Sequence, residues 1–192
     1  MERSKMKGNV ILIDADYVDC VAAELTAGFQ DMLFRSLPKA DLAAWLVCSA
    51  LDGGIPEGDN EIQTIFIHTP EKEAMEYFEP GIMKKELDGL AFRDPIVGEF
   101  LMSSIPDTGN IMFDTPLMVQ CVEAVLESKD VKRVVIVPEM TNGGDKILEL
   151  IDKHKDKQVT LLTMEPIQQE GINHALLGYG IMYAMGIKGD EL

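Results

Sequence analysis

Two patterns of hydrophobic and polar residues alternate along this chain. Short runs rich in apolar residues lie at 10–13, 64–67, 98–105, 111–113, 134–137 and 159–162. Runs of this length, bounded by polar or turn-forming residues, predict strands that are buried on both faces. The first run, Val10–Ile13, leads directly into Asp14 and Asp16.

Longer stretches with apolar residues three or four positions apart separate these runs. They predict helices at 18–33, 40–51, 117–125, 145–154 and 174–185, of which the first is clearly amphipathic and 40–51 is apolar nearly all round. Residues 71–87 favour helix but contain Pro80 and Gly81, which predicts two short helices or a helix and a turn. Strands that alternate with helices indicate a mainly parallel sheet covered on both faces. We therefore expect a three-layer, Rossmann-like α/β fold, built by residues 1–192 as one domain.

The composition narrows the classes of partner. The formal net charge is −16, from 33 acidic and 17 basic residues, and an acidic surface opposes close approach to nucleic acid. No stretch is long and apolar enough to span a membrane, and no secretory cleavage site follows the apolar run that ends at Asp14, so we expect a cytoplasmic protein with no membrane partner. The three cysteines form no Cys-x-x-Cys pair, which argues against a zinc site or a disulfide framework.

Acidic side chains follow several of the predicted strands. Asp14 and Asp16 follow the first, Asp114 follows 111–113, Glu139 follows 134–137, and Asp145 opens the next helix. Because the carboxyl ends of parallel strands meet at one edge of a sheet, these acids are candidate ligands of Mg²⁺ or Mn²⁺, which prefer oxygen. Aspartate is also a common helix N-cap, so Asp16, Asp114 and Asp145 have a structural explanation that needs no metal.

The order of these residues resembles the motifs of the PIN-like nuclease superfamily, especially its NYN branch. Asp14 matches the metal-binding acid at the first strand end, Asp114 matches the acid that opens the middle helix, and Glu139 with Asp145 corresponds to the acidic turn after a later strand. The resemblance implies a PIN-like fold and metal-dependent hydrolysis of RNA. Asp14, Asp114 and Asp145 would then be the catalytic residues, holding one or two Mg²⁺ ions that activate water.

Two alternatives follow from the same residues. Tyr17 and Gln120 stand where that family has Asn and Asp, which is compatible with a non-catalytic relative that serves in binding or assembly. Residues 10–18 also resemble the first motif of haloacid dehalogenase-like phosphohydrolases. In that reading Asp14 is the phosphoryl-accepting nucleophile, Asp16 is the general acid and Thr69 belongs to the second motif, although no phosphate-binding lysine is identifiable from the sequence.

The apolar segments also suggest self-association. The chain has 12 methionines, and residues 40–51 and 174–187 are apolar nearly all round the predicted helices. Three glycines in the second segment weaken its helix propensity, so a helix there needs support from packing. Core packing alone would account for these residues, but a homodimer or other homo-oligomer is the interpretation we prefer.

Overall fold

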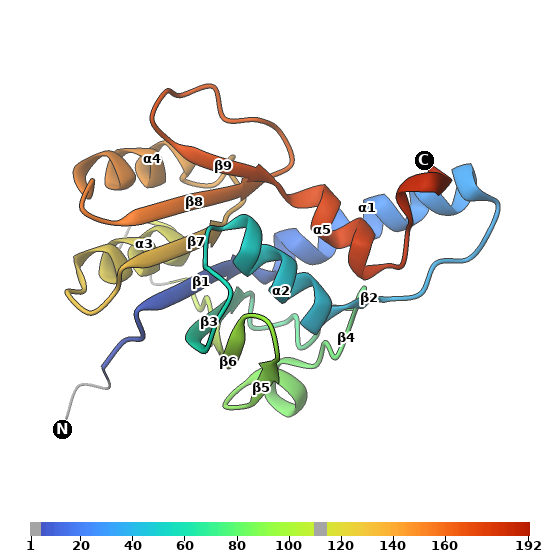
Figure 1. Ribbon diagram of the computed structural model, residues 1–192, viewed down its shortest axis with the longest axis horizontal. Helices are drawn as coiled ribbons and strands as arrows, with labels where there is room; N and C mark the ends of the chain where they lie inside the picture. Colours follow the sequence, from blue (N-terminus) through green and yellow to red (C-terminus); the bar gives the residue numbers. More distant parts are fainter. Residues whose placement is uncertain (1–4, 110–114) are drawn as a thin grey trace.

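A seven-stranded sheet forms the centre of the structure, a computed structural model that describes residues 5–109 and 115–192 (Figure 1). The strand order is β5-β6-β3-β1-β7-β8-β9, and every neighbouring pair is parallel except β5 with β6. The strands are β1 (Asn9–Asp14), β3 (Asn60–His68), β5 (Ala91–Asp94), β6 (Gly98–Pro106), β7 (Arg133–Val137), β8 (Gln158–Thr163) and β9 (Asn173–Leu176). Two further short strands, β2 (Ala40–Asp41) and β4 (Phe78–Glu79), pair with each other in a second sheet.

Helices cover both faces of the large sheet, as the sequence predicts. They are α1 (Ala15–Leu33), α2 (Leu42–Asp52), α3 (Leu117–Glu127), α4 (Gly144–Lys153) and α5 (Leu177–Ala184). Successive side chains of a strand point to opposite faces, so Ile11 and Ile13 of β1 pack with α1, α2 and α5, while Val10 and Leu12 pack with α3 and α4. The three-layer α/β architecture is therefore confirmed.

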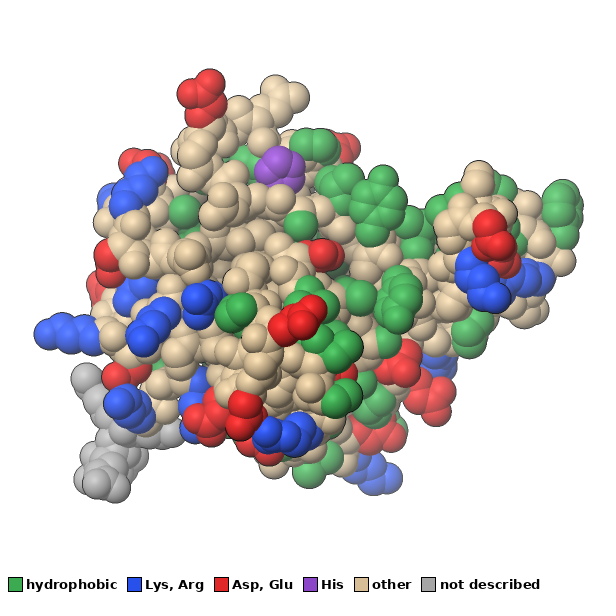
Figure 2. Space-filling model, in the orientation of Figure 1, with side chains coloured by type: hydrophobic (Ala, Val, Ile, Leu, Met, Phe, Trp, Pro, Cys, Tyr) green, Lys and Arg blue, Asp and Glu red, His purple; other side chains and the backbone are tan. Residues whose placement is uncertain are grey.

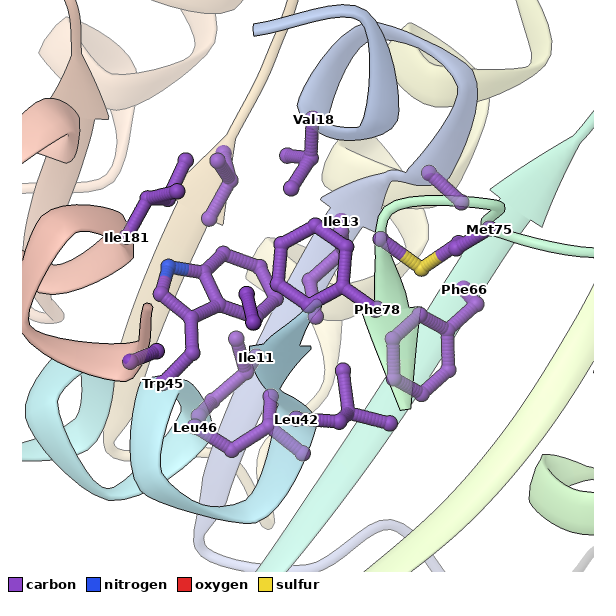
Figure 3. Close-up of a cluster of buried hydrophobic side chains, with 14 of the residues drawn as sticks. Ile11, Ile13, Val18, Leu42, Trp45, Leu46, Phe66, Met75, Phe78 and Ile181 are labelled. Atoms are coloured by element: carbon purple, nitrogen blue, oxygen red, sulfur yellow. The ribbon is translucent and has the colours of Figure 1, made fainter. Parts of the chain in front are cut away.

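Aromatic side chains anchor the larger of the two cores (Figure 3). The rings of Trp45 and Phe78 lie 5.3 Å apart between centroids, and each residue is only 1% exposed. Ile181 of α5 and Val18 of α1 reach the same cluster (Figure 3). A Cβ atom at Gly180 would lie 3.4 Å from Cδ1 of Trp45, at ordinary van der Waals distance, so α5 packs directly against α2. This packing joins α1, α2 and α5 in one core on the same face of the sheet.

Residues 71–87 differ from the helical prediction. Their only helical segment is one π-helical turn, η1 (Met83–Leu87), and the rest is loop with the short strand β4. Met75 and Phe78 are each 1% exposed, so the segment is held by burial in the core. The Glu86 carboxylate accepts hydrogen bonds from the backbone N–H groups of Gly81 and Ile82, both at 2.9 Å. Core burial and these turn contacts override the helix propensity.

The predicted last helix also begins later than expected. Asn173–Leu176 forms β9, which pairs with β8, and α5 begins only at Leu177. The open edge of β8 supplies hydrogen-bonding partners to Asn173–Leu176, and this pairing takes the place of the first turn of the predicted helix. The sequence reading also missed β5, which pairs antiparallel to β6 at the other edge.

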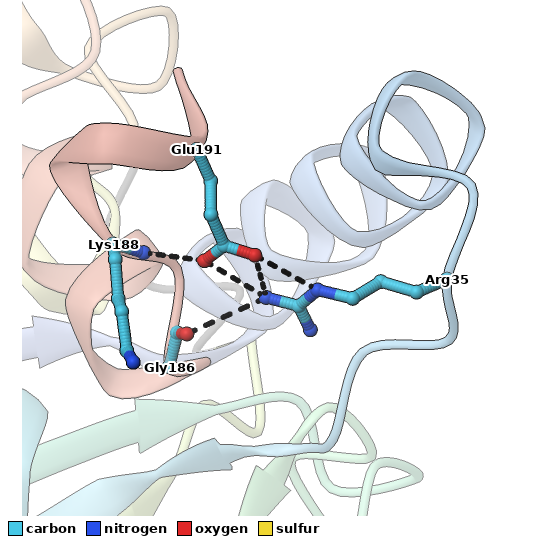
Figure 4. Close-up of polar contacts among 4 residues, drawn as sticks. All are labelled: Arg35, Gly186, Lys188 and Glu191. Atoms are coloured by element: carbon cyan, nitrogen blue, oxygen red, sulfur yellow. Dashed lines mark hydrogen bonds and ion pairs between the residues drawn. The ribbon is translucent and has the colours of Figure 1, made fainter.

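The end of α1 is tied to the end of the chain (Figure 4). Nε and Nη2 of Arg35 donate to the Glu191 carboxylate at 3.0, 2.8 and 3.1 Å, and the backbone N–H of Lys188 donates to it at 2.8 Å. The bond from Lys188 and then the bonds from Arg35 lower the pKa of Glu191. These contacts hold the turn η2 (Gly189–Glu191) against the segment that follows α1.

Across residues 5–109 and 115–192, none of the helices has both the length and the apolar character that crossing a bilayer requires.

Candidate functional site

The carboxyl ends of β1 and β7 lie where the strand order reverses. From β1 the chain builds β3 and β6 on one side and then β7, β8 and β9 on the other. In open α/β sheets this reversal leaves a crevice outside the carboxyl ends of the two central strands, and ligands bind there. Asp14 ends β1, and Glu139 follows β7 by two residues. The fold therefore places two of the predicted acids at its most suitable binding position.

Asp14 combines a structural contact with an unfavourable charge environment. Its Oδ1 accepts the backbone N–H of Tyr17 at 3.0 Å, so it is the N-cap of α1. Burial raises the pKa of its carboxyl group above the usual 3.8, and the negative charges of Asp16 and Glu139 raise it further, against the opposing effects of the Tyr17 N–H and of Lys72. Holding a charged Asp14 in the fold therefore costs free energy, which a bound cation would offset.

Glu139 lines a pocket that is formed largely by the segments that follow β7 and β8. Its Oε1 accepts the hydroxyl of Thr141 at 2.9 Å. The pocket has a volume of about 400 Å³ and is lined by Tyr17 of α1, by residues 139–141 and by residues 163–167. Burial raises the pKa of the Tyr17 hydroxyl, and the charges of Glu139, Glu24 and Asp14 raise it further. These effects favour the protonated form of the Tyr17 hydroxyl, which is able to donate a hydrogen bond.

Asp16 connects the site to the next strand. Its Oδ2 accepts the backbone N–H of Thr69 at 2.8 Å, directly after the end of β3. One carboxylate oxygen is therefore engaged in holding α1 against the β3 loop. The sequence allows Asp16 to be a metal ligand or a helix cap, but in the structure the N-cap of this helix is Asp14.

The remaining two predicted acids are Asp145 and Asp114. Asp145 is exposed in the first turn of α4, whose N-cap is Gly143, with a φ of 88°. Its negative charge is favourable near a helix N-terminus. Asp114 lies outside the described residues. Within 5–109 and 115–192, no three His, Cys, Asp or Glu side chains come together in a group that could hold a metal ion.

The sequence reading gave no positive role to two residues at this end of the sheet. Tyr17 departs from the PIN-like pattern, yet it lines the pocket and its backbone N–H donates to Asp14. Lys72 lies in the loop after β3, within the stretch expected to be helical, and its charge acts on Asp14. The position of Lys72 after a strand that neighbours β1 is the signal that could have identified it.

Comparison with known proteins identifies the family but not its activity. Residues 3–192 match the family described as "Family of unknown function (DUF6621)", and the chain belongs to that family. No curated protein and no solved structure matches the chain.

Proposed function

We propose that this family member binds a divalent cation, Mg²⁺ or Mn²⁺, at the carboxyl ends of β1 and β7 and hydrolyses a phosphate ester there. The observation on which the proposal depends is the environment of Asp14. Its pKa is raised by burial and by two further acids, Asp16 and Glu139, at the point where the strand order reverses. Acids of like charge gathered at such a position favour a cation between them.

The residues present suit magnesium better than a metal that takes three or more ligands from the protein. The described residues contain no group of three metal-binding side chains, but Mg²⁺ is commonly held by one or two carboxylates together with water and substrate phosphates. Asp14 and Glu139 would supply the two carboxylates. Asp114, which the PIN-like resemblance adds as a third, lies outside the described residues.

The roles of the side chains follow from their contacts. The Tyr17 N–H fixes one oxygen of Asp14 at 3.0 Å, which leaves the other oxygen for a ligand. Lys72 supplies a positive charge near Asp14, suited to a substrate phosphate. A bound divalent cation would neutralise phosphate charge and lower the pKa of a bound water. The resemblance to NYN nucleases implies RNA as the substrate, whereas a net charge of −16 opposes a long polyanion.

A second candidate, phosphomonoester hydrolysis of the haloacid dehalogenase type, is favoured by one contact. The hydrogen bond of 2.8 Å between Asp16 and the Thr69 N–H brings together the two motifs that this resemblance requires, and Lys72 is a candidate for its missing lysine. In this reaction Asp14 would attack phosphorus and release the alcohol, which takes a proton from Asp16. Water would then hydrolyse the aspartyl phosphate, releasing inorganic phosphate and regenerating Asp14.

A calorimetric titration with Mn²⁺ tests the cation site, and the chain offers a matched control. Asp14 and Asp41 cap α1 and α2 with the same contact, a backbone N–H at 3.0 Å, and asparagine caps helices as well as aspartate does. We expect wild type and Asp41→Asn to bind Mn²⁺ equally, and Asp14→Asn to bind it at least about 10-fold more weakly. Equal binding by all three proteins would falsify the site.

Activity measurements then separate the two reactions. Cleavage of single-stranded RNA that needs Mn²⁺ and Asp14 supports the nuclease, and hydrolysis of a small phosphomonoester supports the second candidate. If Mn²⁺ binds but neither substrate reacts, the protein is a binding scaffold and the hydrolytic proposal is wrong.

A further inference from the structure

A pocket at the amino ends of β1 and β7 gathers positive charge in an otherwise acidic protein. Its volume of about 560 Å³ is in the range of ligand pockets. Five of the 17 basic residues of the chain line it, but only two of the 33 acids. Figure 2 shows Lys and Arg side chains gathered at this end of the molecule, on the left of the view. The basic residues are Lys5, Lys7, Lys129, Lys132 and Arg133, and the acids are Glu61 and Asp130.

The two acids of the pocket leave most of its positive charge uncompensated. Each acid pairs with one lysine, either Lys5 or Lys7. Among the residues that the structure describes, Lys129, Lys132 and Arg133 form no ion pair. The net charge of −16 does not cancel these groups, because salt at physiological strength screens exposed charges that lie more than about 8 Å apart. The pocket therefore attracts a small anion although the whole protein is acidic.

Two residues that line the pocket carry buried polar atoms without a partner. Across residues 5–109 and 115–192, three buried side-chain atoms lack a hydrogen bond, and Oδ1 of Asn9 and Nε of Arg133 are two of them. Asn9 is only 8% exposed. The two residues are paired in the register of β1 and β7, so their side chains lie on the same face of the sheet. Such unpaired atoms are rare in native proteins, and an acceptor next to a donor suits a ligand that offers both groups.

The turn that carries Lys129 and Asp130 is held in place from inside the protein. The side chain of Lys157 is only 7% exposed, and its Nζ donates to the backbone oxygens of Ser128 at 2.6 Å and Val131 at 2.8 Å. These bonds fix the backbone on both sides of the two pocket residues. A pocket whose wall is already ordered loses less conformational entropy when a ligand binds.

We propose that this pocket binds a small phosphate ester that carries hydroxyl groups, such as a sugar phosphate. Arg133 would donate to the phosphate, Lys129 and Lys132 would add positive charge, and Oδ1 of Asn9 would accept a ligand hydroxyl. A nucleic acid fits less well, because a long polyanion would extend beyond the pocket over an acidic protein. Asn9 begins β1 and Asp14 ends it, which separates this pocket from the proposed hydrolytic site by about 16 Å. The two proposals are therefore independent.

Calorimetric titration of the full chain with ribose 5-phosphate tests this site. EDTA is present throughout, so that the proposed cation site does not contribute. Arg133→Gln should bind at least about 10-fold more weakly than wild type, because it loses a charged donor to the phosphate. Arg93→Gln is the matched control, since Arg93 also lies on a strand of this sheet but outside the pocket, and it should bind as wild type does. Circular dichroism confirms that each variant is folded, and Lys129→Gln, in the exposed turn, replaces Arg133→Gln if the latter is not.

Sulfate tests the contact with Asn9. Sulfate carries no proton to donate at neutral pH, so wild type should bind it more weakly than ribose 5-phosphate. Asn9→Ala should lose about 5-fold in affinity for ribose 5-phosphate and bind sulfate as wild type does. Equal losses for both anions would refute the hydroxyl contact.

Three results overturn the proposal as a whole. The first is that wild type does not bind ribose 5-phosphate at millimolar concentrations. The second is that folded Arg133→Gln, or Lys129→Gln in its place, binds it as tightly as wild type does. The third is that a short RNA oligonucleotide binds more tightly than ribose 5-phosphate and loses this affinity steeply with added salt, which would make the basic residues a nucleic-acid surface.

Discussion

The two ends of the parallel sheet treat acidic side chains differently. At the amino ends of β1 and β7, a pocket of about 560 Å³ contains two acids, and each pairs with a lysine. Glu61 lies 2.8 Å from Lys7 and Asp130 lies 3.5 Å from Lys5. At the carboxyl ends, the pKa of Asp14 is raised by burial and by the negative charges of Asp16 and Glu139. The contrast indicates that a cation bound at the carboxyl end would stabilise the protein, because it would offset the unfavourable burial of a charged Asp14.

The largest effect we predict concerns a lysine that stabilises the loop at the amino end. The Lys157 side chain is only 7% exposed, and its Nζ donates to the backbone oxygens of Ser128 at 2.6 Å and Val131 at 2.8 Å. Lys157→Met leaves both oxygens without this donor and should lower the free energy of unfolding by about 2–3 kcal/mol. Urea unfolding measures the change.

Lys129→Met is the control for this prediction, because Lys129 is exposed in the same loop and should change stability by less than about 0.5 kcal/mol. Equal losses in the two variants would mean that the buried ammonium group has no special role, and that the charges of the amino end act only collectively.

A smaller effect of opposite sign is expected at the carboxyl end. The folded state raises the pKa of Asp14 above 3.8, so the folded state binds this proton more tightly than the unfolded state. Wild type therefore loses stability as the pH rises from 3.8 through the raised pKa, and the loss is complete above it. Asp14→Asn keeps the cap and cannot ionise, so it should be more stable than wild type by about 1 kcal/mol at neutral pH. The difference should vanish below pH 3.8.

Urea unfolding of both proteins across this pH range measures the difference. Asp41→Asn reports what the loss of charge does at an ordinary helix N-terminus, which should be within about 0.5 kcal/mol. Saturating Mn²⁺ should reverse the order of stability at neutral pH, because only wild type binds it tightly. If Asp14→Asn is less stable than wild type without metal, the charge at Asp14 is stabilising and the contrast between the two ends is wrong.

Some elements of the fold could be predicted from the sequence pattern, and others could not. Unbroken apolar runs such as Val10–Ile13 predicted the buried parallel strands, because burial on both faces favours apolar residues at successive positions. The same logic failed at Asn173–Leu176, where composition favours a buried helix but the open edge of β8 decides the outcome. It failed again at 71–87, where buried Met75 and Phe78 override local propensity. These outcomes depend on partners that are distant in sequence.

The sequence could predict at which end of the sheet the acids of the candidate site lie, but it could not predict the contacts that each side chain makes there. That Asp14 and Glu139 come together follows from strand order alone, since both follow central parallel strands. That Asp16 is engaged by the Thr69 N–H, and that Asp145 lies exposed on α4, depends on loop geometry that has no local signature. The contribution of Lys72 depends on the same loops.

The smallest effect we predict is at the ion pair between Lys7 and Glu61. Their side chains are 34% and 59% exposed, so solvent and salt screen the attraction, and the coupling energy should be no more than about 0.5 kcal/mol. A double-mutant cycle with Lys7→Gln and Glu61→Gln measures it, and it should approach zero near 1 M NaCl. A coupling above about 1 kcal/mol that persists in salt would show that pairing at the amino end is itself a major source of stability. A small coupling energy would mean that the exposed ion pairs at the amino end contribute little to stability. The difference between the two ends would then come almost entirely from Asp14, because burying its charge near Asp16 and Glu139 is unfavourable unless a cation is bound.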